Sequence, residues 1–542
     1  MPSGAQILVK ALELEKTHLL FGYPGAVICS FLDEVASSDF LTYRLVRHEQ
    51  NAGHAASGYA RASGKPGICF ATSGPGATNL LTSLATAYMD SIPLIAITGQ
   101  VESRLIGSDV FQEADITGAA EPFCKHSYQV RDAADLPRIV KEAFYIAQTG
   151  RQGPVLIDIP VDVFNQKVND PIYPKKVEIR GYKPCVNGHP LQIKRVAEQI
   201  QKAKKPVICA GGGIFSSGAR EELFSLTEKC KIPVVTTMMG IGVLPVGYPL
   251  LFGMLGLFGQ KIANRAIQDC DLLILAGARV GDRALNAPSK IAAHTSVVHL
   301  DIDPAEIGKN VEADLPIVGD IGKILSELAK IVQPGDTAAW CAHLHDLQQK
   351  SVSTNRIPPE GFISPRNFFE TLSAHLNEDA LLVSDVGQAQ IWAANYCGLK
   401  KGRFLTSGGM GTMGYALPAA LGAACAQPNK QVVAVCGDGG FHMSMMELST
   451  IKQYHLAVKI IVMRNDCLGM VHEIQAKRFG RRYVATEFEG GGPNYQILAE
   501  AYGIKSRKVT SSTDIPAAIQ DFLETPGAYL LECPVDPDEP TL

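Results

Sequence analysis

Residues 431–440 read QVVAVCGDGG, and residues 459–465 read KIIVMRN. Each stretch is a short apolar run typical of a buried strand, and the runs lead directly into Asp438 and Asn465. In open α/β folds the carboxyl ends of parallel strands meet at one edge of the sheet, where ligands bind. We therefore expect Asp438 and Asn465 to lie close together at such an edge.

These two side chains predict a metal-diphosphate site. A carboxylate and an amide oxygen suit Mg²⁺, which takes few protein ligands and completes its octahedron with phosphate oxygens and water. The flanking Gly437 and Gly439 let the backbone approach the phosphates closely. A Gly-Asp-Gly tripeptide alone is typical of an ordinary turn, so the prediction depends on the two strand-like runs.

Short β-rich runs alternate with helix-like stretches along the chain, which predicts βαβ units and parallel sheets. A chain of 542 residues is too long for one hydrophobic core. Segments near 165–190, rich in proline, lysine and glycine, and near 333–365 are interpreted as linkers. We expect an α/β fold with three doubly wound parallel-sheet domains at residues 1–165, 190–332 and 365–542.

The two outer blocks resemble each other. Residues 153–162 (GPVLIDIPVD) align with residues 527–536 (GAYLLECPVD), sharing the glycine, a leucine and the closing Pro-Val-Asp. A second correspondence joins residues 67–99 to residues 432–465, where strand, glycine turn, helix and strand recur in order. Duplicated sheets that share one ligand would each hold one end of it, which fits a cofactor with a ring and a diphosphate.

Composition excludes several functions. The formal net charge of −4 gives no reason to expect nucleic acid or an anionic membrane as partner. No uninterrupted apolar stretch approaches the ~18 residues that a membrane span needs. The 13 cysteines include no CxxC pair, and several lie inside apolar runs, so we expect a cytoplasmic protein with reduced thiols.

The motifs together resemble a known family. Gly437-Asp438-Gly439 through Asn465 is similar to the signature of the thiamin diphosphate-dependent decarboxylases and carboligases. Within that superfamily the chain resembles the acetolactate synthase (acetohydroxyacid synthase) large, catalytic subunits. The resemblance is nearly end to end, from GYPGAVI at residue 22 through LTSGGMGTMGYALPAALGAA at residue 405 to NDCLGMV at residue 465.

The resemblance implies roles for residues in both outer blocks. Glu49 matches the acid that pairs with N1′ of the cofactor's aminopyrimidine. Phe111, Gln112 and Gly25 match positions that line the reaction pocket. Thiamin diphosphate would contact Glu49, Gly387, Gln388, Gly411, Met413, Gly437, Asp438, Gly439, Gly440, Asn465, Cys467, Gly469 and Met470, and Mg²⁺ would bind Asp438, Asn465 and the Cys467 backbone oxygen.

The middle block has a strand followed by three glycines, which alone is weak evidence for a dinucleotide. Its motifs come in the order of the FAD-binding domain of acetolactate synthases, so the resemblance implies FAD as a mostly structural cofactor. One departure is Leu257-Phe258-Gly259 where the family often has Met-His-Gly, and this leaves a FAD-free variant open. The implied FAD residues are Gly211, Gly212, Met254, Leu255, Gly256, Gly277, Arg279, Asp301, Ile302 and Asp320.

Two further departures concern the acceptor substrate. Glu473 and Ile474 stand where the biosynthetic family usually has Gln-Trp, and Val161 stands where it often has lysine. The tryptophan is associated with a preference for 2-ketobutyrate. A hydrophobic pocket discriminates one methylene by only about 1 to 3 kcal/mol, so pyruvate is the expected main acceptor.

The function implied is the decarboxylation of pyruvate and transfer of the hydroxyethyl unit to a second 2-ketoacid. The products are 2-acetolactate or 2-aceto-2-hydroxybutyrate, which enter branched-chain amino acid biosynthesis. In the family the site lies between two subunits, with Glu49 of one facing Asp438 of the other. We therefore expect a homodimer or homotetramer, and the resemblance leaves room for a small regulatory subunit.

Three alternatives stay open at this point. A flavin-dependent pyruvate oxidase would share the thiamin diphosphate motifs and would bring the flavin near the reacting carbon. A related carboligase would use another acceptor, such as a sugar ketone or a sulfonate. A cofactor-binding subunit without catalysis is disfavoured, because it would not need Glu49.

Overall fold

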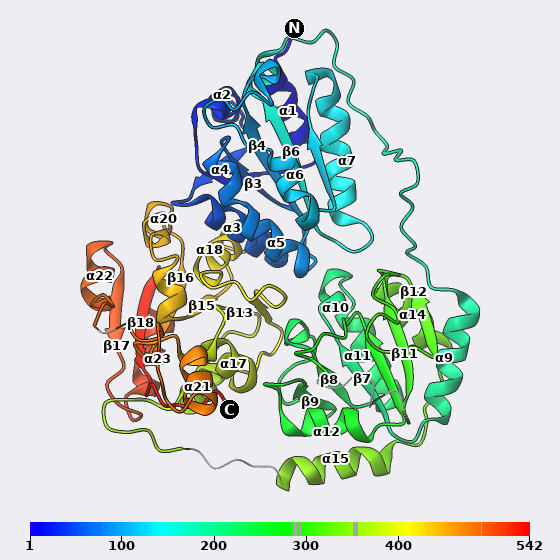
Figure 1. Cartoon of the computed structure of the whole chain (residues 1–542). Helices are drawn as coiled ribbons and strands as arrows, with labels where there is room; N and C mark the ends of the chain where they lie inside the picture. Colours follow the sequence, from blue (N-terminus) through cyan, green and yellow to red (C-terminus); the bar gives the residue numbers. More distant parts are fainter. Residues whose placement is uncertain (286–290, 292–293, 351–355, 489) are drawn as a thin grey trace.

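The computed structural model describes residues 1–285, 291, 294–350, 356–488 and 490–542. Three six-stranded sheets form separate regions, at the top, the lower right and the lower left of Figure 1 in chain order. Every pair of neighbouring strands in these sheets runs parallel. The prediction of an α/β fold with three parallel sheets is confirmed.

The N-terminal sheet has the strand order β2-β1-β3-β4-β6-β5. Its central strands β3, β4 and β6 are buried along their whole length, as expected for strands covered on both faces. The strands are β1 (Leu19–Gly22), β2 (Thr42–Leu45), β3 (Gly67–Ala71), β4 (Leu94–Gln100), β5 (His126–Gln129) and β6 (Pro154–Pro160). The helices are α1 (Gly4–Leu14), α2 (Cys29–Ala36), α3 (Glu49–Ser63), α4 (Pro75–Asn79), α5 (Leu81–Met89), α6 (Ile116–Ala120), α7 (Leu136–Gln148) and α8 (Val161–Asn165).

The C-terminal sheet repeats this topology strand for strand, with the order β14-β13-β15-β16-β18-β17. The apolar runs that lead into Asp438 and Asn465 form β15 and β16, which are hydrogen-bonded neighbours. The strands are β13 (Leu381–Ser384), β14 (Arg403–Thr406), β15 (Val432–Gly437), β16 (Val458–Arg464), β17 (Lys505–Lys508) and β18 (Tyr529–Pro534). The helices are α16 (Pro365–His375), α17 (Gln388–Tyr396), α18 (Ala416–Ala426), α19 (Asp438–His442), α20 (Glu447–Gln453), α21 (Gly469–Arg478), α22 (Tyr495–Ala501) and α23 (Ile515–Glu524).

The middle sheet has a different order, β12-β11-β10-β7-β8-β9, in which the strand sequence reverses between β7 and β10. This is the order of dinucleotide-binding sheets, which bind ligands at the point of reversal. The strands are β7 (Pro206–Ala210), β8 (Val234–Thr236), β9 (Leu251–Met254), β10 (Leu272–Ala276), β11 (Ser296–Asp301) and β12 (Leu315–Val318). The helices are α9 (Pro190–Lys202), α10 (Gly213–Ser216), α11 (Arg220–Cys230), α12 (Lys261–Asp269), α14 (Ile321–Ile331) and α15 (Ala338–Lys350).

The two outer sheets pack together through their equivalent helices α3 and α18 (Figure 1). The packing is reciprocal and very close. A Cβ built on Gly58 of α3 would lie 1.9 Å from the Ala419 carbonyl oxygen, and one on Gly422 of α18 would lie 1.8 Å from the Ala55 carbonyl oxygen. Glycine is therefore required at both contacts, and the two helices share one buried apolar core.

The two connecting segments differ from each other. The first, between α8 and α9, contains no helix or strand apart from an isolated bridge between Ser3 and Lys167. The second was expected to be a linker, but its first half forms α15. Trp340 and Leu344 lie one turn apart on this helix and are buried in the core of the middle region. Among the described residues, no helix is both long and apolar enough to cross a membrane.

Candidate cofactor site

Three helices of the C-terminal region begin where strands end, and their N-termini converge. Helix α17 follows β13, α19 follows β15 and α21 follows β16, so they start at Gln388, Asp438 and Gly469. Unpaired backbone N–H groups and the helix dipole make such N-termini suited to anions. Glycine makes the sharp turn from β13 into α17 possible, because Gly387 has φ of 102°, which other residues rarely adopt.

Asp438 is almost fully buried, and backbone amides hold its carboxylate. Its Oδ2 accepts from the Asn465 and Asp466 amides at 3.0 and 2.6 Å, and its Oδ1 accepts from the Gly439 amide at 2.8 Å. Burial raises the pKa of Asp438 to about 7, against the lowering effect of these three hydrogen bonds. The structure thus brings Asp438 and Asn465 together, as the strand pattern predicted.

Asn465 also contacts Gln388. The Asn465 Nδ2 group donates to Gln388 Oε1 at 3.0 Å, and Asn465 Oδ1 lies 3.4 Å from the Cys467 amide. A Cβ at Gly469 would lie 1.9 Å from Gln388 Oε1, so only glycine leaves room for this pair. Cys467 is buried, and burial raises the pKa of its thiol to about 12, so the thiol stays protonated. Its backbone oxygen is therefore the group that could bind a metal.

Asp385 is a residue that the sequence analysis missed. Its fully buried carboxylate accepts from the amides of Val386, Gly414 and Ala416, which join β13 to the start of α18. A Cβ on Gly440 would lie 2.6 Å from Asp385 Oδ1. Asp385 therefore fixes the loop that carries Met413. The only feature of the sequence that could have indicated it is its position two residues before Gly387.

The middle region presents a second set of predicted residues at the reversal of its sheet. Cβ atoms on Gly211 and Gly213 would lie 2.2 and 2.7 Å from backbone atoms of Gly277, so the turns after β7 and β10 touch. Asp301 ends β11, and burial raises its pKa to about 6. Asp320 caps α14 by accepting from the Lys323 amide at 3.1 Å.

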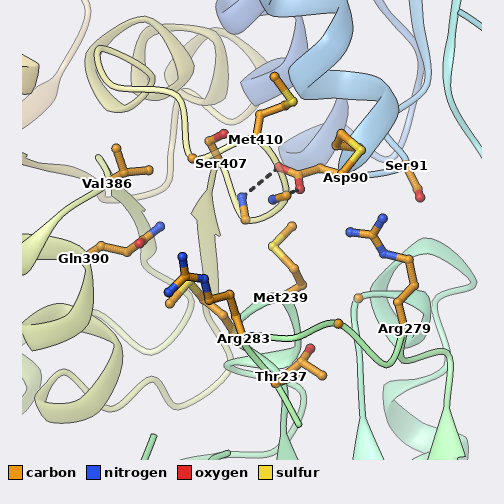
Figure 2. Close-up of a pocket in the computed structure, with 18 of the residues that line it drawn as sticks. Asp90, Ser91, Thr237, Met239, Arg279, Arg283, Val386, Gln390, Ser407 and Met410 are labelled. Carbon is orange, nitrogen blue, oxygen red and sulfur yellow. Dashed lines mark hydrogen bonds between the residues drawn. The ribbon is translucent and has the colours of Figure 1, made fainter. Parts of the chain in front are cut away.

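A cavity of about 1000 Å³ joins these two sets of residues. It lies between the middle and C-terminal regions and reaches the N-terminal region at Asp90 and Ser91 (Figure 2). Arg61 and residues 89, 92 and 148–152 also line it from the N-terminal region. Of the predicted thiamin diphosphate residues, its walls include Gly387, Gln388, Gly411, Met413, Gly437, Asp438, Gly439, Gly440, Asn465, Cys467, Gly469 and Met470. Of the predicted FAD residues, its walls include Gly212, Met254, Leu255, Gly277, Arg279, Asp301, Ile302 and Asp320, while Gly211 and Gly256 lie in the adjoining turns.

The residues that line this cavity include charged groups that the sequence analysis did not single out. Asp90 follows α5 and accepts from the Gly408 and Gly409 amides at 3.0 and 2.7 Å, so it ties the N-terminal region to the loop of Met413 (Figure 2). Burial raises the pKa of Asp90, and the nearby Arg61 opposes this shift. No local pattern marks Asp90, because its partners lie more than 300 residues away in sequence.

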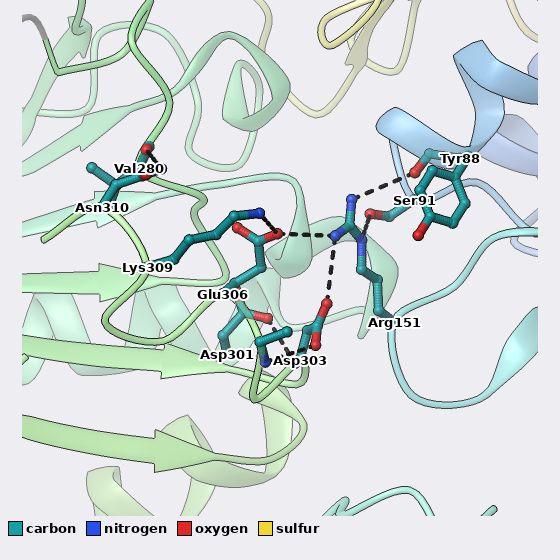
Figure 3. A network of polar contacts seen from close by, with 10 residues as sticks. Tyr88, Ser91, Arg151, Val280, Asp301, Asp303, Glu306, Lys309 and Asn310 are labelled. Carbon is teal, nitrogen blue, oxygen red and sulfur yellow. Dashed lines mark hydrogen bonds and ion pairs between the residues drawn. The ribbon is translucent and has the colours of Figure 1, made fainter. Parts of the chain in front are cut away.

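Arg151 joins the N-terminal region to the end of β11 (Figure 3). Its Nη1 contacts Glu306 Oε1 at 3.0 Å and Asp303 Oδ2 at 3.4 Å, and its Nε donates to Ser91 Oγ at 2.9 Å. The Glu306 carboxylate is 7% exposed and also pairs with Lys309. Arg151 lines the cavity beside Asp301 and Ile302, so it belongs to the candidate FAD site although it was not predicted.

The four predicted residues of the N-terminal region lie elsewhere. Glu49 begins α3 and accepts from Asn79 Nδ2 at 3.0 Å. A Cβ on Gly74 would lie 2.9 Å from the Gln112 Cα atom, and one on Gly25 would lie 2.3 Å from the Thr72 side chain. Gly25, Glu49 and Gln112 therefore surround the turn between β3 and α4.

This N-terminal group is separate from the cavity within one chain. None of Gly25, Glu49, Phe111 and Gln112 lines the cavity described above. The Phe111 side chain is 87% exposed, and Gln112 has a positive φ of 59°, so the loop presents an apolar ring to solvent. Within the described residues, the buried Thr72 and Ser73 hydroxyls of the same turn have no hydrogen-bond partner. These residues could therefore bind one side of a ligand whose other side is held elsewhere.

Of the residues that depart from the family pattern, Ile474 and Phe258 line the cavity, whereas Val161, Leu257 and Glu473 do not. Ile474 and Val471 line the cavity on α21, and Phe258 lines it from the middle region. Val161 starts α8, directly after β6. The wall beside Met470 is therefore aliphatic.

The residues present fit both cofactors and a divalent cation. Three helix N-termini and open space around Gly387, Gly411 and Gly437 suit a diphosphate. The volume is at the upper end of that of ligand pockets, which suits a large dinucleotide. Among the described residues, no cluster of three or more His, Cys, Asp and Glu side chains could hold a metal, so a cation would use Asp438 with amide, carbonyl and phosphate oxygens.

Three family models match the chain in order. They describe the thiamine pyrophosphate enzyme's N-terminal TPP binding domain (residues 2–119), its central domain (residues 193–328) and its C-terminal TPP binding domain (residues 385–533). Each match falls on one of the three sheets.

Similar proteins extend this likeness over nearly the whole chain. A probable acetolactate synthase large subunit of Methanococcus aeolicus is 44% identical over 99% of this chain and 92% of its own length. An acetolactate synthase large subunit of Porphyra purpurea is 43% identical, over 96% of this chain and 90% of its own length. One of Corynebacterium glutamicum is 42% identical, over 96% of this chain and 85% of its own length.

Proposed function

Because the chain belongs to the thiamine pyrophosphate enzyme family, and within it to the acetolactate synthase large subunits, we propose that it joins two 2-ketoacids with loss of CO₂. Pyruvate is the donor. Pyruvate as acceptor gives 2-acetolactate, and 2-ketobutyrate gives 2-aceto-2-hydroxybutyrate. The observation that carries this function is the meeting of Asp438, Asn465 and Gln388 at three helix N-termini.

Asp438, Asn465 and the Cys467 backbone oxygen are proposed to hold Mg²⁺ against the cofactor's diphosphate. Thiamin diphosphate, when bound, supplies the nucleophilic carbon and the electron sink for decarboxylation. Met413 and Met470 line the cavity beside this site, where their flexible side chains can fix the shape of the bound cofactor. The charge of Asp438 is needed for the metal, because Mg²⁺ binds the ionised carboxylate.

Glu49 is proposed to hold a proton at N1′ of the cofactor's pyrimidine, with Gln112 orienting the substrate and Phe111 excluding water. These groups lie outside the cavity of their own chain, and Phe111 is exposed. A second copy of the chain could place its own Glu49, Phe111 and Gln112 over the site around Asp438, so we propose a homodimer or a dimer of dimers. A small regulatory subunit is compatible with the large-subunit relatives.

FAD is proposed to occupy the part of the cavity that faces the middle sheet. Asp301 and Asp320 can accept hydrogen bonds from hydroxyl groups, and Arg279 and Arg151 supply positive charge beside them. Residues 1–165, 190–332 and 365–542 are proposed as the domains that hold the pyrimidine, the flavin and the diphosphate. The aliphatic Ile474 favours pyruvate as acceptor over 2-ketobutyrate.

The test is 2-acetolactate formation from pyruvate by purified protein with Mg²⁺, thiamin diphosphate and FAD. We expect product from the wild type and a loss of about 100-fold or more in Glu49→Gln, because the amide cannot transfer the proton. Glu327→Gln, which removes an exposed ion pair with Lys330, is the matched control. Release of CO₂ without acetolactate would contradict the acceptor, and bleaching of flavin by pyruvate without oxygen would favour an oxidase.

A further inference from the structure

Residues 539–541 form a short strap that lies across the starts of α17 and α21. Gln388 Nε2 donates to the Glu539 carbonyl at 3.0 Å, and Trp392 Nε1 donates to the Pro540 carbonyl at 3.1 Å. The Thr541 amide donates to Glu473 Oε2 at 3.1 Å, and the Thr541 hydroxyl donates to the same oxygen. Each residue of the strap is therefore bound to a helix that borders the candidate diphosphate site.

The strap is also held from its other side. Arg356 contacts Glu539 Oε2 at 2.9 Å and Asp536 Oδ2 at 2.6 Å, and it donates to the Asp538 carbonyl at 3.1 Å. A guanidinium with these partners fixes the backbone just before the strap. The strap thus has anchors on both faces.

Glu473 connects the strap to Gln388. Its side chain is only 17% exposed, and its second oxygen pairs with Lys477 one turn along α21. Glu473 Oε2 lies 3.4 Å from Gln388 Nε2, so one carboxylate oxygen faces both the strap and the Gln388 amide. Glutamate stands here where the family usually has glutamine, so a charged carboxylate takes the place of an amide at this point.

The orientation of Gln388 determines that of Asn465. With Nε2 facing the Glu539 carbonyl and Glu473, Gln388 must turn Oε1 toward its other neighbour. That oxygen accepts from Asn465 Nδ2 at 3.0 Å, so the Asn465 carbonyl oxygen points away from Gln388. An amide that binds a cation must present its oxygen, and hydrogen bonds from surrounding groups commonly set this orientation.

We propose that Glu473 and Thr541 are positioning residues of the metal-diphosphate site, acting through the strap and Gln388 on Asn465. The inference rests on the proposed function, since it assigns the Asn465 oxygen to the metal. It adds that residues 539–541 are part of the site although none of them lines the cavity.

The experiment compares Glu473→Ala, Glu473→Gln and Thr541→Val with the wild type. Glu370→Gln, which breaks an ion pair with Arg366 on α16, is the control. Calorimetric titration with Mg²⁺ at saturating thiamin diphosphate gives the metal affinity. Glu473→Ala should weaken it by about 10-fold, the lower end of the range for groups that orient a metal ligand. Thr541→Val keeps the backbone hydrogen bond to Glu473, so its loss should be smaller. Glu473→Gln keeps an acceptor for Thr541, so we expect a loss of about 2-fold.

A second readout follows the strap without any cofactor. The chain has two tryptophans, so Trp340→Phe leaves Trp392 as the sole tryptophan, whose emission is read by exciting tryptophan selectively over tyrosine. Release of the Pro540 carbonyl should expose Trp392 and shift its emission to the red in Glu473→Ala and Thr541→Val, but not in Glu370→Gln. A red shift with unchanged Mg²⁺ affinity would overturn the positioning role, and no shift would overturn the strap itself. A wild type that binds no Mg²⁺ with thiamin diphosphate would instead overturn the proposed function.

Discussion

Asp158 shows how a single buried acid can set the pH dependence of this protein's stability. The side chain lies inside β6, where it accepts from Thr98 Oγ1 at 2.7 Å and from Gln100 Nε2 at 3.2 Å. Burial raises the pKa of Asp158 from 3.8 to about 7 despite these two donors. The folded protein therefore holds a proton that the unfolded chain releases.

We predict that this group destabilises the folded state as pH rises. Between its unfolded pKa of 3.8 and its folded pKa of about 7, the folded state binds more protons, so the stability contribution falls through that window. The loss has an upper limit of about 4 kcal/mol. Asp158→Asn cannot ionise, so its melting temperature relative to the wild type should rise between pH 5 and pH 8. The exposed Asp336→Asn should show no such trend.

Arg151 is predicted to matter for flavin retention. Arg151→Ala removes the ion pairs with Glu306 and Asp303, and among the described residues the buried Glu306 keeps its pair with Lys309. Loss of one partner of a buried charge pair is costly, and the cavity wall beside Asp301 would lose its positive charge. We expect FAD affinity, measured by flavin fluorescence, to fall about 10-fold, or ~1.4 kcal/mol. Arg138→Ala, which breaks half-exposed pairs on α7, should leave it unchanged.

The sequence predicts some of these residues and misses others for a physical reason. Asp438 and Asn465 follow strands directly, so local pattern and parallel pairing are enough to bring them together. Asp90 and Arg151 act on groups in other regions of the chain, and no short motif encodes those distant partners. Asp385 was also missed, because its partners Gly414 and Ala416 lie about 30 residues away in sequence and no short motif joins them to it.

At the scale of elements, the contact between α3 and α18 is predicted to tolerate no side chain. Gly58→Ala would place a methyl group 1.9 Å from the Ala419 carbonyl oxygen, which forces the helices apart. We expect a loss of about 3 kcal/mol or more, measured by chemical unfolding, together with weaker activity because Glu49 begins the same helix. Gly64→Asn, at the left-handed end of α3 with open space around it, should cost only a few tenths of a kcal/mol. Equal losses in both variants would contradict this reasoning.

Strands were the easier elements to predict. The runs that form β3, β4, β15 and β16 are mostly apolar, since helices cover both faces of a parallel sheet. Helix α15 was missed because only three of its residues, Trp340, Leu344 and Leu347, are large and apolar. Its attachment depends on Trp340 and Leu344, whose partners belong to β7 and α12.

At the scale of the whole molecule, the separation of Glu49 from the site around Asp438 within one chain predicts complementation between inactive variants. Glu49→Gln and Asp438→Asn should each be nearly inactive alone. Co-expressed, they should form mixed dimers in which one site carries both substitutions and the other carries neither. Random pairing would restore about a quarter of the wild-type activity. Purified mixed dimers that stay inactive would show that each site is built within one chain.

The reciprocal glycine contact of α3 and α18 has a consequence for the history of the chain. The two outer regions share one strand order and meet through equivalent helices, so they are related to each other as the subunits of a twofold dimer are. A gene duplication and fusion, with the middle region inserted between the copies, accounts for this arrangement. The contact between the two outer regions then does not depend on the chain that connects them. Fragments 1–165 and 190–542 produced as separate chains should therefore reassociate.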